Sequence, residues 1–182
     1  MQNKNTIKSI LLLISFFLIT SCSNNSAMKP EDFKNKEPRL IIEEYLSGDV
    51  KAWGVLQDRS GKVTRQFSAN LNGTWDGKQL ILKERFNWDD GEIQDREWTI
   101  NKIDDHNYEG TAGDVVGKAK GFSYGPAFKF EYVLLVPVKG RELKITFDDW
   151  IFKQDDRVAI NRATMTKFGF KVAELTVVFV KD

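Results

Sequence analysis

The sequence has few of the residues on which many chemistries depend. It contains one cysteine and one histidine, and its 27 basic residues are balanced by 26 acidic ones. One cysteine excludes an intrachain disulfide, and the lone His106, in an Asp-Asp-His-Asn turn, has no His or Cys partner for a zinc site. Without a basic excess, a nucleic-acid-binding surface is also excluded. We therefore expect no metal, no cofactor and no nucleic-acid partner.

A long apolar run occurs at the start of the chain, from Ile10 to Ile19. It is shorter than the roughly 20 residues that a membrane-spanning helix needs, and Lys4 and Lys8 precede it. A basic start, a short apolar run and small residues after it predict a secretory signal peptide over residues 1–21.

The residues at the end of this signal, Ile19-Thr20-Ser21-Cys22, resemble the bacterial lipobox. The resemblance implies that Cys22 is acylated and becomes the N-terminus, so that lipid anchors the protein to a membrane. Ser23, in place of an aspartate, favours the outer membrane, on its periplasmic side. Residues 22–38 are polar and predict a flexible tether, which leaves residues 39–182 as one domain.

From residue 50 onwards, apolar and polar residues alternate with period two, which predicts β-strands. Asp-Gly and Gly-containing turns separate the strands. The expected strands cover residues 50–57, 63–75, 79–88, 93–103, 107–122, 127–138, 141–154, 157–168 and 170–180, and residues 39–46 could form a short helix or an extended lead-in.

Consecutive antiparallel strands with short turns must protect two sheet edges, and closure into a barrel removes both. The sequence therefore predicts an all-β fold, a single up-and-down lipocalin-like barrel of about 8–10 strands, with a two-sheet sandwich as the alternative.

The glycine-rich stretch 112–119 ends in Gly-Lys-Ala, without the Ser or Thr that holds Mg²⁺ in a phosphate-binding P-loop. Glycines and a proline follow where that motif needs a helix, so we exclude nucleotide binding. As part of a strand over 107–122, Gly113, Gly117 and Gly121 share one face. A face with so few side chains lets the strand coil sharply or leaves open volume inside the barrel.

Three ordered motifs then carry a family resemblance: Tyr108–Gly121, Phe147–Trp150 and Asn161–Phe170. Together they resemble a family of uncharacterised bacterial lipoproteins, a domain of unknown function, over residues 46–181. The resemblance implies no catalytic residue, and Cys22 alone carries over as functional. A more distant likeness to the lipocalin superfamily would pack Trp53 under Arg162. That superfamily carries a glycine before this tryptophan, and the present chain has Ala52 there.

Several charged residues alternate with apolar ones and are therefore expected to face inward: Arg65, Glu84, Arg162, Asp149 if its strand has no bulge, and Arg96 if the turn over 89–92 carries one extra residue. Because isolated buried charges cost several kcal/mol, they either form internal salt bridges or anchor the polar group of a ligand. Aromatic residues of 127–138 would supply the apolar wall. The candidate ligand-binding residues are Arg65, Glu84, Arg96, Phe128, Phe130, Tyr132, Asp149, Trp150 and Arg162.

We therefore expect a protein that binds or carries a hydrophobic small molecule, such as a lipid or fatty acid, in the barrel. Two alternatives remain open. The first is an envelope interaction or assembly factor that uses outward apolar residues such as Ile81, Val133 and Leu135. The second is a lipid isomerase or hydrolase in which Glu84 and Asp149 act as an acid and base pair.

Overall fold

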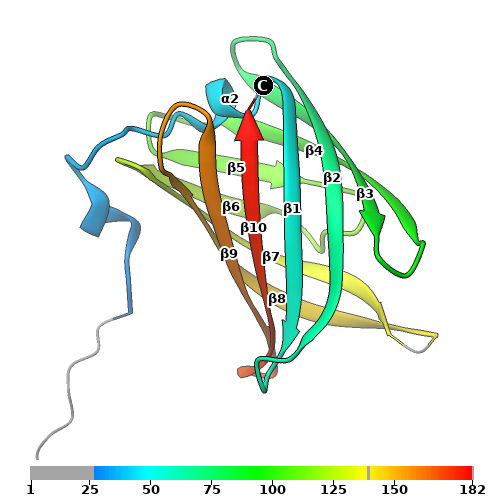
Figure 1. The fold of residues 1–182 in the computed structure, drawn as a ribbon. Helices are drawn as coiled ribbons and strands as arrows, with labels where there is room; N and C mark the ends of the chain where they lie inside the picture. The colour runs from blue at the N-terminus through cyan, green and yellow to red at the C-terminus, as the bar shows by residue number, and fades with distance from the viewer. Residues whose placement is uncertain (1–26, 139, 182) are drawn as a thin grey trace, which may run out of the picture.

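The computed structural model describes residues 27–138 and 140–181. Its strands form one closed antiparallel barrel in which each strand pairs with its sequence neighbours and β1 pairs with β10 (Figure 1). The predicted all-β up-and-down barrel is confirmed. Its elements are η1 (Pro30–Phe33), α2 (Ile42–Tyr45), β1 (Gly48–Asp58), β2 (Val63–Trp75), β3 (Gln79–Trp88), β4 (Ile93–Lys102), β5 (Asn107–Thr111), β6 (Ala119–Tyr124), β7 (Ala127–Val138), β8 (Arg141–Lys153), β9 (Val158–Lys167) and β10 (Phe170–Lys181).

Alternation along each strand sorts the side chains between the interior and the outer surface. In β2, Phe67 and Leu71 are buried, whereas Ser68 and Asn70 between them are exposed. Since successive side chains of a strand point to opposite faces, one face of β2 builds the core and the other meets water.

The segment predicted as one long strand over 107–122 is two short strands, and that prediction is wrong. β5 pairs with β4 only from Thr99 to Lys102, and β6 begins at Ala119. Gly113 and Gly117 lie in the connecting loop, and Gly117 has a φ of 76° that favours glycine. They are not part of a strand wall.

The loop over residues 112–118 lies against the half of β7 that β6 does not reach. Val116 N donates to Val133 O at 2.8 Å, and Leu135 N donates to Asp114 O at 2.9 Å. The loop thereby supplies β7 with backbone partners, and it places the Asp114 side chain against the interior.

One end of the barrel is closed by α2 (Figure 1). Ile42 of this helix and Leu46 at its C-terminus are buried. Lys181 Nζ, at the end of β10, donates to the carbonyls of Glu44, Tyr45 and Ser47 at 2.7–2.9 Å. A cation at a helix C-terminus satisfies carbonyls that the helix leaves unpaired.

A buried carboxylate fixes the same helix to the barrel. Glu43 accepts hydrogen bonds from Lys102 Nζ at 2.7 Å and from the Tyr108 hydroxyl at 2.9 Å. Burial by itself raises the pKa of Glu43, but these two donors outweigh it and hold the pKa below its ordinary value. The helix is therefore held by charge as well as by apolar packing.

Inner side chains are less buried towards the opposite end, where the turns after β1, β3, β7 and β9 lie. On β10, Val177 is buried and Leu175, one step nearer that end, is half-buried. We call this end the mouth.

Before α2, part of the predicted tether contacts the barrel: Phe33 of η1 packs on Trp150 and Phe152. Among residues 27–138 and 140–181, no helix is long and apolar enough to cross a membrane.

Candidate functional site

The barrel encloses a cavity of about 300 Å³. A volume of this size lies at the small end of ligand pockets. Much of the wall is aromatic: Trp98 packs on Phe130 with ring centroids 5.2 Å apart, and Tyr132 stacks on Phe147 at 5.0 Å. The predicted wall residues Phe128, Phe130 and Tyr132 all line the cavity.

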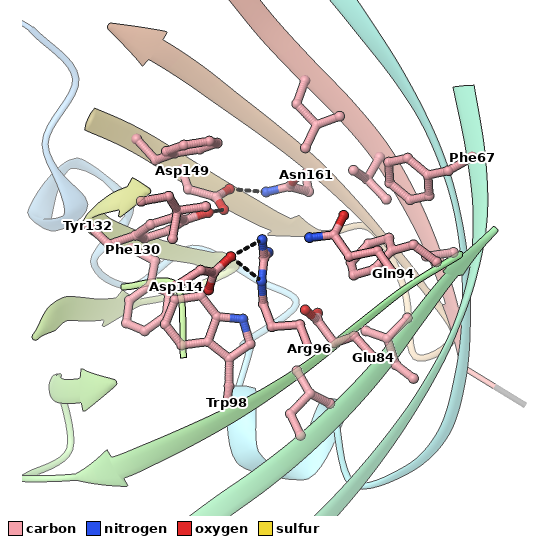
Figure 2. A pocket seen from close by; sticks show the side chains of 18 of the residues that line it. Phe67, Glu84, Gln94, Arg96, Trp98, Asp114, Phe130, Tyr132, Asp149 and Asn161 are labelled. Atoms are coloured by element: carbon pink, nitrogen blue, oxygen red, sulfur yellow. Dashed lines mark hydrogen bonds and ion pairs between the residues drawn. The ribbon is translucent and has the colours of Figure 1, made fainter. Parts of the chain in front are cut away.

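A cluster of polar side chains interrupts this apolar wall (Figure 2). Arg96 of β4 donates through Nε and Nη2 to Asp114 Oδ2, at 3.1 and 2.7 Å. The ion pair connects β4 to the 112–118 loop. The second oxygen of this carboxylate, Asp114 Oδ1, is buried without a hydrogen-bond partner in the described structure. An unpaired buried acceptor is costly, so this oxygen would gain from a donor brought by a ligand.

Asp149 of β8 has donors on both of its oxygens. The Tyr132 hydroxyl donates to Oδ2 at 2.8 Å, and Asn161 Nδ2 of β9 donates to Oδ1 (Figure 2). Burial raises the pKa of Asp149 despite these two hydrogen bonds. Asp149 is thus held in place by the protein itself.

Glu84 of β3 sits opposite Arg96 in the β3–β4 register and lines the cavity. Burial raises its pKa to about 7, against the lowering effect of the Arg96 charge. A carboxyl group with such a pKa exchanges its proton near neutral pH, so it can meet a ligand either as a donor or as an acceptor.

Arg65 of β2 lies nearer the mouth and has its own partners. It donates through Nη2 to Asp90 Oδ1 at 2.8 Å and to Glu92 Oε2 at 2.9 Å, and its guanidinium lies 4.0 Å from the Trp88 ring centroid. These contacts join β2 to the β3–β4 turn at the edge of the cavity. Arg65 is therefore apart from the Arg96 cluster.

Seven of the nine candidate residues line the cavity, namely Arg65, Glu84, Arg96, Phe128, Phe130, Tyr132 and Asp149. The expectation that Arg162 faces inward is wrong: its exposed side chain donates to Glu174 Oε1 at 3.1 Å on the outer surface. Inner positions of β9 are taken by Ala159, Asn161 and Ala163, which are buried.

Trp150 also lies outside the cavity, because it alternates with the inward Asp149. It is nevertheless buried, under Phe33. The lipocalin-like pairing of Trp53 with Arg162 is likewise not formed inside the barrel, since Trp53 is 50% exposed. In the structure, Arg162 is the cross-strand neighbour of Trp150.

The three outward apolar candidates, Ile81, Val133 and Leu135, are half-buried. Val133 is paired with the 112–118 loop, and Leu135 lines the cavity edge. Cys22, the predicted lipidation site, lies outside the described residues. The most exposed large apolar side chains among the described residues are those of Phe168 and Phe170.

Sequence reasoning missed four polar residues of the cavity: Glu92, Gln94, Asp114 and Asn161. Gln94 lies two residues before Arg96, and Asn161 lies between Ala159 and Ala163. The period of two along a strand therefore places both side chains on the inner face. Asp114 could not be found in this way, because the sequence pattern predicts a strand over residues 112–118, where the structure has a loop.

Comparison with solved structures found barrels of similar shape. One is the S-type phycobiliprotein lyase CPES from Guillardia theta, with a TM-score of 0.57 and 8% identity over 77% of this chain and 90% of that one. Another is a protein with unknown function from the DUF3598 family of Nostoc punctiforme, with a TM-score of 0.60 and 15% identity over 81% of this chain. This chain covers 51% of that second structure. At such identities the likeness shows the fold alone.

Comparison with curated proteins found no match. A family model described as "Protein of unknown function (DUF3833)" matches residues 16–181, which is nearly the whole chain. The match confirms the resemblance to a domain of unknown function, and the lipid anchor stays a prediction. The protein belongs to the DUF3833 family of proteins of unknown function.

Proposed function

We propose that the protein binds a small, mostly hydrophobic molecule inside the barrel, with the polar end of that molecule at Arg96, Asp114 and Glu84. The observation that supports it is a cavity of about 300 Å³ whose largely aromatic wall is interrupted by a few polar side chains, among them Arg96, Asp114 and Glu84. Ligand sites characteristically combine apolar walls with a few polar groups that fix orientation. A solidly packed interior would instead have favoured internal salt bridges as the only role of the inward charges.

The charges of the cluster favour a ligand whose head group donates hydrogen bonds. Three carboxyl groups, of Glu84, Asp114 and Asp149, face the cavity near one guanidinium, that of Arg96. Arg96 is already bound to Asp114, while Asp114 Oδ1 lacks a partner. An amine or hydroxyl head group complements these acceptors, whereas a carboxylate would add like charge. Of the ligands expected from the sequence, a fatty acid therefore fits less well than a lipid with a donor head group.

Three probes with the same tail test this proposal: decylamine, decanol and decanoate. Displacement of an environment-sensitive fluorophore from the purified protein gives their relative affinities. We expect the amine and the alcohol to bind, and decanoate to bind more weakly. Strongest binding by decanoate would contradict the head-group assignment, and binding by none of the three would contradict the cavity function.

Two variants on β10 separate the cavity from the outer surface in the same assay. Leu175 lines the cavity near the mouth, whereas Val178 is 38% exposed on the outer face. Leu175→Trp adds volume inside and should abolish probe binding, because the cavity is small. Val178→Trp, a similar enlargement, should leave binding unchanged.

The membrane anchor remains part of the same proposal. Lipidation of Cys22, predicted from the lipobox, would hold the barrel at the periplasmic side of the outer membrane and close to a source of lipid. Incorporation of labelled palmitate into the wild-type chain and its loss in Cys22→Ser tests this. Fractionation of the envelope tests the location.

An enzymatic function for Glu84 and Asp149 is the less favoured alternative. An acid and base pair needs environments that separate the two pKa values. Burial raises the pKa of both groups, and Asp149 accepts hydrogen bonds from Tyr132 and Asn161. The arrangement therefore suits binding better than proton transfer between the two carboxyls.

A further inference from the structure

The mouth of the barrel carries an apolar surface that the cavity does not explain. Phe168, in the turn between β9 and β10, and Phe170, the first residue of β10, are 89% and 77% exposed. Large aromatic side chains are rarely left this open on a protein surface, and grouped apolar exposure marks an interaction site.

The backbone at Phe168 makes this exposure more unusual. Phe168 has a φ of 52° and the following Gly169 a φ of 81°. Turns of this kind between two strands favour Asn-Gly, because asparagine tolerates positive φ and bulky residues do not. A phenylalanine here gives up local stability while its ring remains in solvent. Strain at an exposed residue points to a role in function.

Neighbouring turns extend the apolar surface along the mouth. Since β10 pairs with β1 and β9 pairs with β8, the β9–β10 turn lies between the β1–β2 and β7–β8 turns. Exposed apolar residues are found on all three: Val63, Val138 and Val172 in addition to the two phenylalanines. We call these five residues the mouth rim.

The same three turns are basic. The described residues of the ranges 58–63, 138–142 and 167–172 include five Lys or Arg residues and two acidic ones. Lys167 Nζ lies 5.3 Å from the centroid of the Phe168 ring. The turn between β3 and β4, which contains Asp89, Asp90 and Glu92, carries the acidic charge of this end instead. Apolar tips flanked by basic side chains complement a surface of anionic lipid headgroups over a hydrocarbon layer.

We propose that the mouth rim docks onto an anionic lipid bilayer, with Phe168 and Phe170 inserted among the headgroups. Docking through this end brings the cavity entrance against the membrane, so a hydrophobic molecule could pass between the two without crossing water. The proposal depends on the rim residues and not on the ligand assigned to the cavity.

A reporter within the full chain tests this docking. Cys22→Ser removes the single cysteine, after which Val172→Cys places a nitrobenzoxadiazole label at the rim and Asp105→Cys places it at the closed end. Phosphatidylcholine vesicles with doxyl-labelled lipid, with or without phosphatidylglycerol, supply the quencher. We expect quenching of the label at 172 with phosphatidylglycerol present, weaker quenching in high salt, and little quenching at 105.

A double variant, Phe168→Asn with Phe170→Thr, shows whether the phenylalanines cause the contact. Asn-Gly suits the turn and threonine suits a strand, so this variant should fold at least as well as the parent. We expect its quenching at 172 to need about tenfold more lipid, because two inserted rings are lost.

Equal quenching at 172 and 105 would overturn the docking, because attachment through the N-terminal segment alone gives that result. Quenching at 172 that the double variant leaves unchanged, or a label at 172 that stays unquenched, would overturn it too. Decylamine binding by the double variant in vesicle-free solution is expected to be normal. The quenching experiment therefore tests the membrane docking of the rim, and decylamine binding separately tests the ligand site in the cavity.

Discussion

Inside the barrel, the hydroxyl of Tyr132 donates a hydrogen bond to Asp149 Oδ2 at 2.8 Å. The two residues belong to the paired strands β7 and β8, and the contact gives a buried carboxylate one of its two side-chain donors. Hydrogen bonds to a charged group contribute more than neutral ones, so this contact should matter to the stability of the barrel.

Replacement of Tyr132 by phenylalanine removes that donor without removing the ring. We expect Tyr132→Phe to lower the free energy of unfolding by about 1.5–3 kcal/mol, because Asp149 loses a partner while it remains buried. Urea unfolding followed by circular dichroism measures the change. Tyr124→Phe is the matched control, since the described structure gives the Tyr124 hydroxyl no hydrogen bond and its ring stacks on His106. Equal losses in the two variants would contradict the role of the hydroxyl.

Glu84 predicts a pH dependence of stability. Its pKa is raised from 4.5 to about 7, so the folded protein holds this proton more tightly than the unfolded chain. Stability from Glu84 is therefore complete below pH 4.5 and falls as the pH rises towards 7, by about 3 kcal/mol in total. Glu84→Gln should lack this fall in urea unfolding between pH 4.5 and 8. The exposed Glu97→Gln is the control, and a parallel profile for wild type and Glu84→Gln would refute the assignment.

Glu43 predicts a pH dependence of stability with the opposite sign to that of Glu84. Despite burial, Lys102 and Tyr108 hold its pKa below the ordinary value of 4.5, so its contribution is present above that pH and is lost as the pH falls. Glu43→Gln should cost about 1.5–3 kcal/mol at pH 7, with a smaller difference from wild type in acid. Chemical unfolding at both pH values tests it, with Glu44→Gln, at an exposed neighbour, as control. A pH-independent difference would count against the ion pair.

Two glycines near the cavity should respond differently to substitution. A Cβ added at Gly110 of β5 would lie 2.4 Å from Cζ of Phe130, a ring held among other aromatic side chains, whereas one at Gly113 meets nothing within 4 Å. Gly110→Ala should cost about 1–3 kcal/mol and weaken decylamine binding, because Phe130 must move. Thermal unfolding and the displacement assay measure both effects. Gly113→Ala should be neutral in both, and similar losses at the two positions would contradict the proposed contact.

Much of the barrel could be predicted from the sequence because alternation is a local signal. The strands over 63–75, 79–88 and 127–138 begin and end where expected. The segment 107–122 was wrongly predicted as one strand because small or apolar residues at 113, 115 and 117 share one face with those at 119 and 121, as they would in a strand. Its identity as a loop depends on contacts with β7, which the local pattern does not contain.

The candidate site was predicted in part for similar reasons. Glu84 and Asp149 interrupt apolar faces, and that local signal places them inside correctly. Arg162 misled because Ile160 and Thr164 suggested an inner face, while the true inner face of β9 carries small residues such as Ala163. Trp150 is buried for a reason far away in sequence, the packing of Phe33 on its outer side.

The central claim is that the cavity holds a hydrophobic molecule, and native mass spectrometry of residues 23–182 exported to the periplasm tests it most directly. Purified without detergent, the wild type should carry a lipid-sized adduct that solvent extraction identifies as an amine- or hydroxyl-bearing lipid. That adduct should be absent from Leu175→Trp and retained in Val178→Trp. A bare mass for all three proteins under gentle ionisation would contradict the account.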